Sequence, residues 1–153
     1  MRRRLKQAAF VVVVLIVAAQ FIRPGRVNPP IDHARTIEAH LGTANPATPV
    51  IHRSCGDCHS NATEWRWYSK VAPLSWVMAR AVTDGREVVN FSEWGSYPRS
   101  VQETLLDASC ASATAGKMPG PYTWFRPDTA LSPKDIEAIC AAARNMHDNI
   151  SLR

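Results

Sequence analysis

The sequence predicts an all-α protein in which a small helical domain follows an N-terminal hydrophobic helix. Two observations lead to this fold class. Several segments repeat their apolar residues at helical spacing, and no segment shows the alternation typical of β-strands. The 11 prolines further indicate that the helices are short and that their connections are long. With 153 residues, the chain suits one core of modest size.

The N-terminal segment differs from the rest of the chain in its charge. Six Lys/Arg and no Asp/Glu lie before residue 28, whereas residues 28–153 hold 12 Lys/Arg against 13 Asp/Glu, a net charge of −1. The basic balance of the protein therefore belongs to this segment and not to a face of the folded domain. We expect no nucleic-acid partner, because such a partner requires a basic stripe on the domain.

Residues 1–27 are predicted to be a signal segment or a transmembrane anchor. A basic start precedes residues 8–22, which are apolar except for Gln20 and span about 22 Å as a helix, against about 30 Å for a bilayer core. We expect a single-pass anchor in the cytoplasmic (inner) membrane with the domain in the periplasm, because no polar cleavage region follows. The alternative is cleavage near Val17-Ala18-Ala19 and a soluble periplasmic protein.

The remaining chain divides into a linker and a domain. Residues 28–47 are rich in Pro and Gly and are predicted to be a linker with one short helix over 32–41. Residues 48–153 form the domain. Four helices are predicted in it. The first starts at Thr48 as N-cap, and the second runs from Pro73 to Gly85, which can adopt the left-handed conformation of a helix end. The third runs from Pro98 to Gly116, and the fourth starts at Ser132 with Asp135 in its first turn.

The most specific motif is Cys55-Gly-Asp-Cys58-His59, the C-x-x-C-H pattern of covalent haem attachment. Two thiols one helical turn apart can each add to one vinyl group of the same porphyrin. The next residue then presents its imidazole to the iron, and its second ring nitrogen usually bonds an oxygen that fixes the ring. The sequence therefore predicts a small cytochrome c-like domain around one covalent haem, with His59 as an axial iron ligand.

Other uses of the motif are weaker. A redox-active C-x-x-C would be expected after a strand in a βαβ unit, and no such strand is predicted. A zinc site needs two more ligands at close spacing, but Cys110 and Cys140 lie 30 residues apart. A disulfide between Cys55 and Cys58 would leave His59 unexplained.

Met118 is the residue we expect to bind the iron opposite His59. It follows a helix end, 59 residues after His59, and Pro119 stiffens the loop. Met78 occupies an apolar position of a helix, where core packing is the better default. The other candidates are less well placed in the sequence: Met146, His33, His40, His52 and His147.

The two remaining cysteines are predicted to form a disulfide. Cys110 and Cys140 belong to no recognisable motif, and two remaining cysteines in an oxidising compartment usually form a disulfide. The loop that they would close contains Met118. Two separate buried thiols are the alternative.

Several further segments are shared with a known family. They are Gln20-Phe-Ile-Arg-Pro24, Cys55-Gly-Asp-Cys-His-Ser-Asn61, Trp65-Arg-Trp-Tyr-Ser69, Ala72-Pro-Leu-Ser-Trp76, Asp84-Gly-Arg86, Asn90-Phe-Ser-Glu-Trp94, Met118-Pro119 and Tyr122-Thr-Trp124.

With these segments the chain resembles the haem-binding domain family of membrane-anchored bacterial c-type cytochromes, over most of residues 20–145. The resemblance implies a small helical haem domain behind an N-terminal hydrophobic segment. Family members often carry a histidine at the places that here hold Ala81 and Arg126. Those places supply no histidine ligand in this chain, which leaves Met118 favoured by both arguments. The resemblance implies no particular partner.

The expected function is electron transfer rather than catalysis, because His/Met ligation leaves no open position for a substrate. The partners would be redox proteins or a membrane respiratory complex. One alternative is a haem sensor or peroxidase-like enzyme with five-coordinate iron, for which Arg80 and Arg126 are the only distal hints. Another is a structural haem subunit of a membrane complex.

Overall fold

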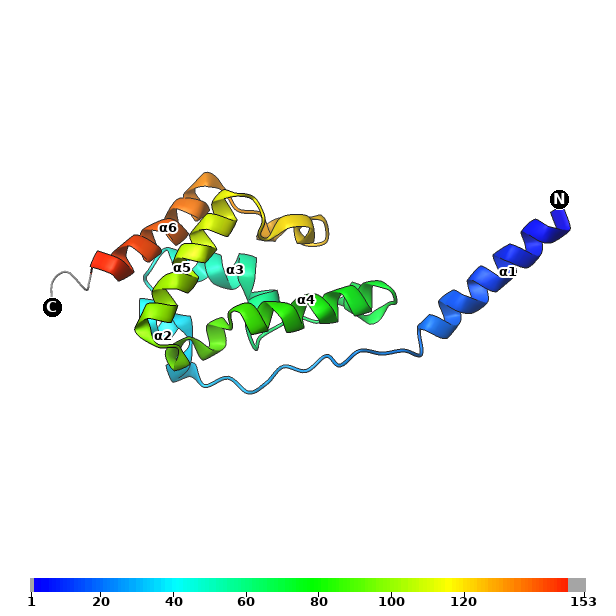
Figure 1. The fold of residues 1–153 in the computed structure, drawn as a ribbon, viewed down its shortest axis with the longest axis horizontal. Coiled ribbons are helices and arrows are strands. Elements are labelled where there is room, and N and C mark those ends of the chain that lie inside the picture. The colour runs from blue at the N-terminus through cyan, green and yellow to red at the C-terminus, as the bar shows by residue number, and fades with distance from the viewer. Residues whose placement is uncertain (1, 149–153) are drawn as a thin grey trace.

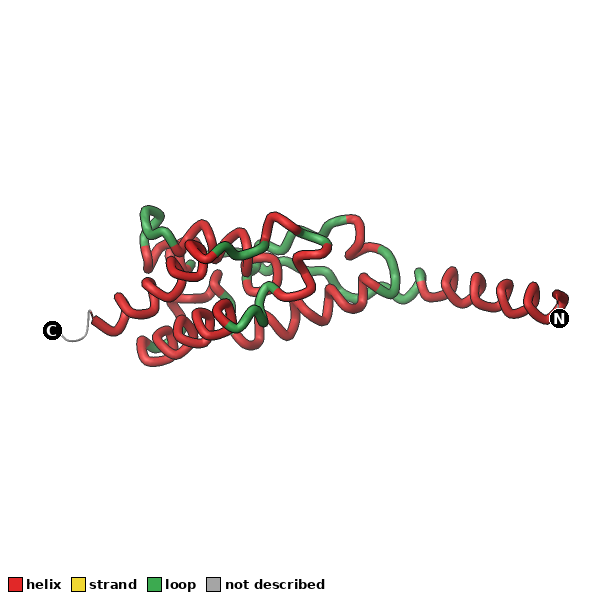
Figure 2. The backbone as a smooth tube through the Cα atoms, turned by 90° about the horizontal axis from the view of Figure 1, so that it is seen from above, coloured by secondary structure: helices red, strands yellow, loops and turns green. Residues whose placement is uncertain are grey.

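The structure is a computed structural model that describes residues 2–148, and over this range it consists of helices and their connections without a strand. The all-α prediction is confirmed. Figures 1 and 2 show a cluster of helices with one helix projecting from it. The α-helices are α1 (Arg2–Ala19), α2 (Ile37–Leu41), α3 (Ala47–His59), α4 (Leu74–Val88), α5 (Arg99–Thr114) and α6 (Pro133–Asp148). The 3-10 helices are η1 (His33–Arg35), η2 (Trp67–Lys70), η3 (Phe91–Ser96), η4 (Gly120–Trp124) and η5 (Pro127–Thr129).

The projecting helix is α1, which buries none of its residues (Figure 1). Across residues 2–148 no helix combines the length and the apolar character that a membrane span requires. The predicted single-pass anchor in the cytoplasmic membrane is therefore wrong. The physical reason is that the 18 residues of α1 include four basic side chains near its start. The uncharged part that follows is about 20 Å long, well short of a bilayer core.

The chain after α1 lies along the domain. The side chain of Gln20 bonds both the backbone N–H and the carbonyl of Ala72, at 3.0 and 3.3 Å. Farther along, Arg86 of α4 donates to the Val27 carbonyl at 2.8 Å and to the Asn28 side chain at 3.0 Å. Long-range hydrogen bonds therefore hold this segment in place.

The short helix predicted over 32–41 is present as η1 and α2, and it belongs to the core. Ile37 is fully buried and packs in the same cluster as Trp94 of η3 and Ile51 of α3. The segment predicted to be a linker thus supplies part of the domain. The cluster is completed by α5, which packs against α6, and by α3, which packs against α4 and α6.

Three of the predicted helix ends can be compared with the observed ones. Thr48 was predicted to be an N-cap, which is wrong, because α3 begins one residue earlier, at Ala47, after Pro46. At the start of α6, Ser132 and Asp135 form the expected capping pair: the Ser132 N–H donates to the carboxylate at 2.8 Å, and the Asp135 N–H donates to the hydroxyl at 3.2 Å. Gly85 does not end its helix, because α4 continues to Val88 and Gly85 has no positive φ. Its role is instead a close packing contact, described below.

The predicted disulfide is present. Cys110 and Cys140 join α5 to α6, with their Cα atoms 4.8 Å apart. The two helices pack side by side (Figure 1). The bond therefore fixes the base of the long connection that contains Met118.

Candidate haem site

A large apolar cavity lies between α3, α4, α5 and the loop before η4. Its volume is about 550 Å³, within the range of cofactor sites in proteins. Both cysteines of the C-x-x-C-H motif, His59 and Met118 line it. The remaining walls are mostly aliphatic and aromatic: Ile51, Val77, Ala81, Val88, Phe91, Leu105, Leu131 and Ile139 are among the lining residues.

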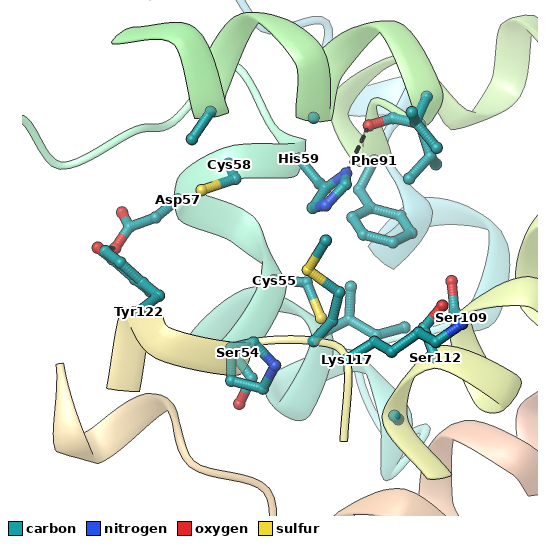
Figure 3. A pocket seen from close by; sticks show the side chains of 18 of the residues that line it. Ser54, Cys55, Asp57, Cys58, His59, Phe91, Ser109, Ser112, Lys117 and Tyr122 are labelled. Atoms are coloured by element: carbon teal, nitrogen blue, oxygen red, sulfur yellow. Dashed lines mark hydrogen bonds between the residues drawn. The ribbon is translucent and has the colours of Figure 1, made fainter. Parts of the chain in front are cut away.

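His59 is the last residue of α3, and its ring points into this cavity (Figure 3). Its Nδ1 lies 3.2 Å from the carbonyl oxygen of Val89, so Nδ1 donates and Nε2 keeps a lone pair for a metal. Burial lowers the pKa of His59 below its ordinary value, more than the Val89 bond raises it. The ring is therefore neutral at pH 7, the form that binds iron.

The two thiols have the properties of structural rather than redox-active cysteines. Both are free, and burial raises the pKa of Cys55 to about 12 and that of Cys58 to about 11. Disulfide oxidoreductases instead lower the pKa of such a cysteine, so the buried thiols of Cys55 and Cys58 do not favour a redox motif. The described residues also contain no cluster of three or more His, Cys, Asp or Glu suited to a metal ion, so a zinc site is not supported.

Gly85 explains how α4 closes over the motif. A Cβ atom at this position would lie 2.5 Å from the carbonyl oxygen of Cys58, closer than real Cβ atoms approach. Only glycine permits this contact between α4 and the end of α3. The sequence shows Asp84-Gly85-Arg86, but the packing role of Gly85 depends on a partner 27 residues away and has no local signal.

Of the seven candidates for the sixth ligand, Met118 and Met78 line the cavity, and the other five do not. Met78 is buried in α4, the helix that covers Cys58. Met118 is 51% exposed. Its neighbours in the loop, Lys117 and Tyr122, lie on the side of the cavity away from α4 (Figure 3).

The charged lining of the cavity is uneven. Lys117 is its one cationic residue among those described, and Ser109 and Ser112 lie near it in Figure 3. Asp57 and Asp84 are the acidic ones. A haem carries two propionate carboxylates, and the corner with Lys117 offers them a positive charge and hydroxyl groups. The sequence shows nothing that singles out Lys117 for this role.

A polar network at the cavity edge is a second feature that the sequence did not predict. The carboxylate of Asp57, within the motif, accepts hydrogen bonds from the hydroxyl of Tyr122 at 2.6 Å and from Nη1 of Arg126 at 2.8 Å. The Asp57 and Arg126 side chains are each only 11% exposed. The hydroxyls of Tyr122 and Tyr68 lie 3.1 Å apart.

The residues present fit a covalently attached haem. The cavity supplies two protonated thiols one helical turn apart, a neutral imidazole with a free nitrogen, and apolar walls for a porphyrin. Its one cation suits the propionates. Each of these features is a property of the chain itself.

Comparison with protein families gives one match: the model of a family described as a haem-binding domain matches residues 14–145. This range is most of the chain and includes every residue of the site described above. Comparisons with curated proteins and with solved structures give no match.

Proposed function

Because the chain belongs to the haem-binding domain family, we propose that it is a mono-haem c-type cytochrome that transfers electrons to and from redox partner proteins. Cys55 and Cys58 would form the thioether bonds, and His59 and Met118 would be the axial ligands. One observation carries the proposal: all four residues line the same apolar cavity. The bound haem supplies a one-electron redox couple at its iron.

The chain contributes a fixed ligand on one side of the cavity. The Val89 carbonyl holds the His59 imidazole in the tautomer that leaves Nε2 free. The apolar walls exclude water, which disfavours the more highly charged ferric form and raises the reduction potential. A thioether from Met118 would act in the same direction, since it is a soft ligand that prefers ferrous iron.

The ion pairs of the two arginines support electron transfer over a five-coordinate enzyme or sensor. Arg80 is bonded to Asp84 on its own helix at 2.8 Å, and Arg126 is bonded to Asp57. Neither arginine lines the cavity. Electron transfer with a closed sixth position is therefore the function that the site supports best.

Replacement of Met118 tests this ligation. Met118→Ala should give high-spin or water-bound iron that binds carbon monoxide rapidly. Met118→His should keep the iron low-spin and lower the reduction potential. Met78→Leu is the matched control: it removes the other thioether of the cavity at nearly constant volume and should change neither spectrum nor potential.

The opposite outcomes are also informative. A high-spin Met78→Leu variant beside an unchanged Met118→Ala variant would assign the sixth position to Met78. Rapid carbon monoxide binding by the unaltered protein would contradict the closed site and favour the sensor or enzyme.

A further inference from the structure

The feature that the proposed function leaves unused is the network around Asp57. This residue lies between the two motif cysteines, whereas Tyr122 and Arg126 follow Met118 in the chain. Their hydrogen bonds to one carboxylate oxygen of Asp57 cross sequence separations of 65 and 69 residues. They therefore tie the loop that carries Met118 to the turn that would be attached to the haem.

Arg126 is oriented for this contact from its own turn. Its Nε and Nη2 bond the carboxylate of Asp128 at 2.9 and 2.7 Å. Its Nη1 is directed at Asp57 at 2.8 Å and also reaches the Glu64 carboxylate at 3.3 Å. The other oxygen of Asp57 accepts the backbone N–H of Glu64 at 3.0 Å. The carboxylate thus has donors on both oxygens and cannot turn away without losing them.

Met118 is 51% exposed and lines the cavity, so contacts with the chain itself do little to fix the direction of its side chain. On its N-terminal side, the backbone N–H groups of Lys117 and Met118 reach the Ser112 carbonyl at 3.0 and 3.4 Å, which ends α5. On its C-terminal side, the loop reaches α3 through Tyr122 and Arg126. Phe125 also packs against Tyr68, with their ring centroids 5.3 Å apart, but Tyr122 and Arg126 provide the hydrogen bonds from this segment to α3.

We propose that Tyr122 and Arg126 are positioning residues for Met118, which they hold over the cavity by binding the carboxylate of Asp57. The proposal rests on Met118 being the sixth ligand. Tyr122 adds a second constraint, because its ring lines the cavity while its hydroxyl is directed to Asp57 (Figure 3). Neither residue binds the iron.

The test uses the haem-loaded full chain with Tyr122→Phe, Arg126→Gln and Arg126→Lys. Arg80→Gln is the matched control: it breaks an ion pair to another cavity-lining carboxylate, Asp84, but within a single helix. The readouts are the far-red charge-transfer band of thioether-bound ferric iron, the reduction potential and the rate of carbon monoxide binding.

Tyr122→Phe and Arg126→Gln should weaken the thioether band, lower the reduction potential and speed carbon monoxide binding by about tenfold, because each removes a hydrogen bond to a charged group. Arg126→Lys keeps the charge and should restore part of the band. In a Met118→Ala background, Tyr122→Phe should add no further change, since the positioned ligand is already gone. Tyr122→Phe keeps the ring that packs in the cavity, so it serves as the test if Arg126→Gln does not fold.

Two results would overturn the proposal in distinguishable ways. If Met118→Ala opens the iron but Tyr122→Phe and Arg126→Gln behave like Arg80→Gln, then the ligation stands and the positioning role is wrong. If Met118→Ala itself changes nothing, then both the ligation and the positioning role are wrong. An equal effect of Tyr122→Phe with and without Met118 would show that it acts elsewhere in the site.

Discussion

The two sides of the cavity are built in different ways. On one side His59 ends a helix, its ring is fixed by the Val89 carbonyl, and Gly85 brings α4 against the backbone of Cys58. On the other side Met118 lies half exposed in a loop between α5 and η4. The first side is held by helix packing and the second by contacts that cross long stretches of sequence.

The two kinds of support predict different effects for substitutions on the two sides. Tight packing at the His59 side couples the ligand to the stability of the whole helical core, because interiors tolerate little added volume. The Met118 loop is held by the disulfide at its base and by side-chain hydrogen bonds to Asp57 at its far end. Changes there should alter ligation more readily than they unfold the core.

The largest effect on stability is expected from removing the disulfide at the base of the loop that contains Met118. Replacing Cys110 and Cys140 together by Ala should lower the free energy of unfolding by about 3.5 kcal/mol on the chain-entropy model, since the closed loop has 30 residues. Denaturant unfolding of the haem-loaded protein measures this. A loss below about 1 kcal/mol would contradict this stabilising role of the disulfide.

A smaller effect is expected on the His59 side from Gly85→Ala. The added Cβ would overlap the Cys58 carbonyl, so α4 must shift, and overpacking of this kind costs about 1–3 kcal/mol. Urea unfolding and the yield of haem-loaded protein report the change. Gly25→Ala is the control, because nothing lies within 4 Å of a Cβ at that position. Equal stability of the two variants would contradict the close contact between α4 and α3.

The smallest expected effect concerns the charge at the cavity corner. Lys117→Gln removes the one cation among the described lining residues, which should favour ferric iron and lower the reduction potential. For a unit charge roughly 10 Å from the iron, Coulomb's law gives a shift on the order of 20–70 mV. Lys70→Gln, an exposed lysine outside the cavity, should leave the potential unchanged within error. An equal shift in both variants would mean that Lys117 does not contact the propionates.

Features that depend on neighbouring residues could be predicted from the sequence, whereas most features that depend on contacts between distant residues could not. The Ser132–Asp135 cap is a local pattern, and it predicted a helix start that is present. The C-x-x-C-H motif is also local, and its three predicted site residues line one cavity. The disulfide followed from cysteine counting. The prediction that Gly85 ends its helix was wrong. Gly85 instead allows a close contact with the backbone of Cys58, which is distant in the sequence. Helical periodicity says nothing about such a contact.

The polar network shows the same limit more clearly. The motif specifies no residue type at position 57, and Arg126 was only a distal hint for a rival function, but the side chains of Asp57 and Arg126 bond each other. They are separated by 69 residues and by several turns, so no spacing rule joins them. The prediction of a membrane-spanning N-terminal helix was wrong for a different reason. The apolar helix was expected to continue to residue 22, but α1 ends at Ala19, so its uncharged part is shorter than the expected length of about 22 Å.

The central claim is that one haem is covalently bound through Cys55 and Cys58. The most direct measurement is mass spectrometry of the protein after denaturation and acid–organic extraction, with expression alongside a cytochrome c maturation system. We predict the mass of the polypeptide plus one haem, with no haem in the extract, and loss of that mass increment in a variant with both Cys55→Ala and Cys58→Ala. Haem that is fully extractable from the unaltered protein, or an unmodified polypeptide mass, would contradict the account.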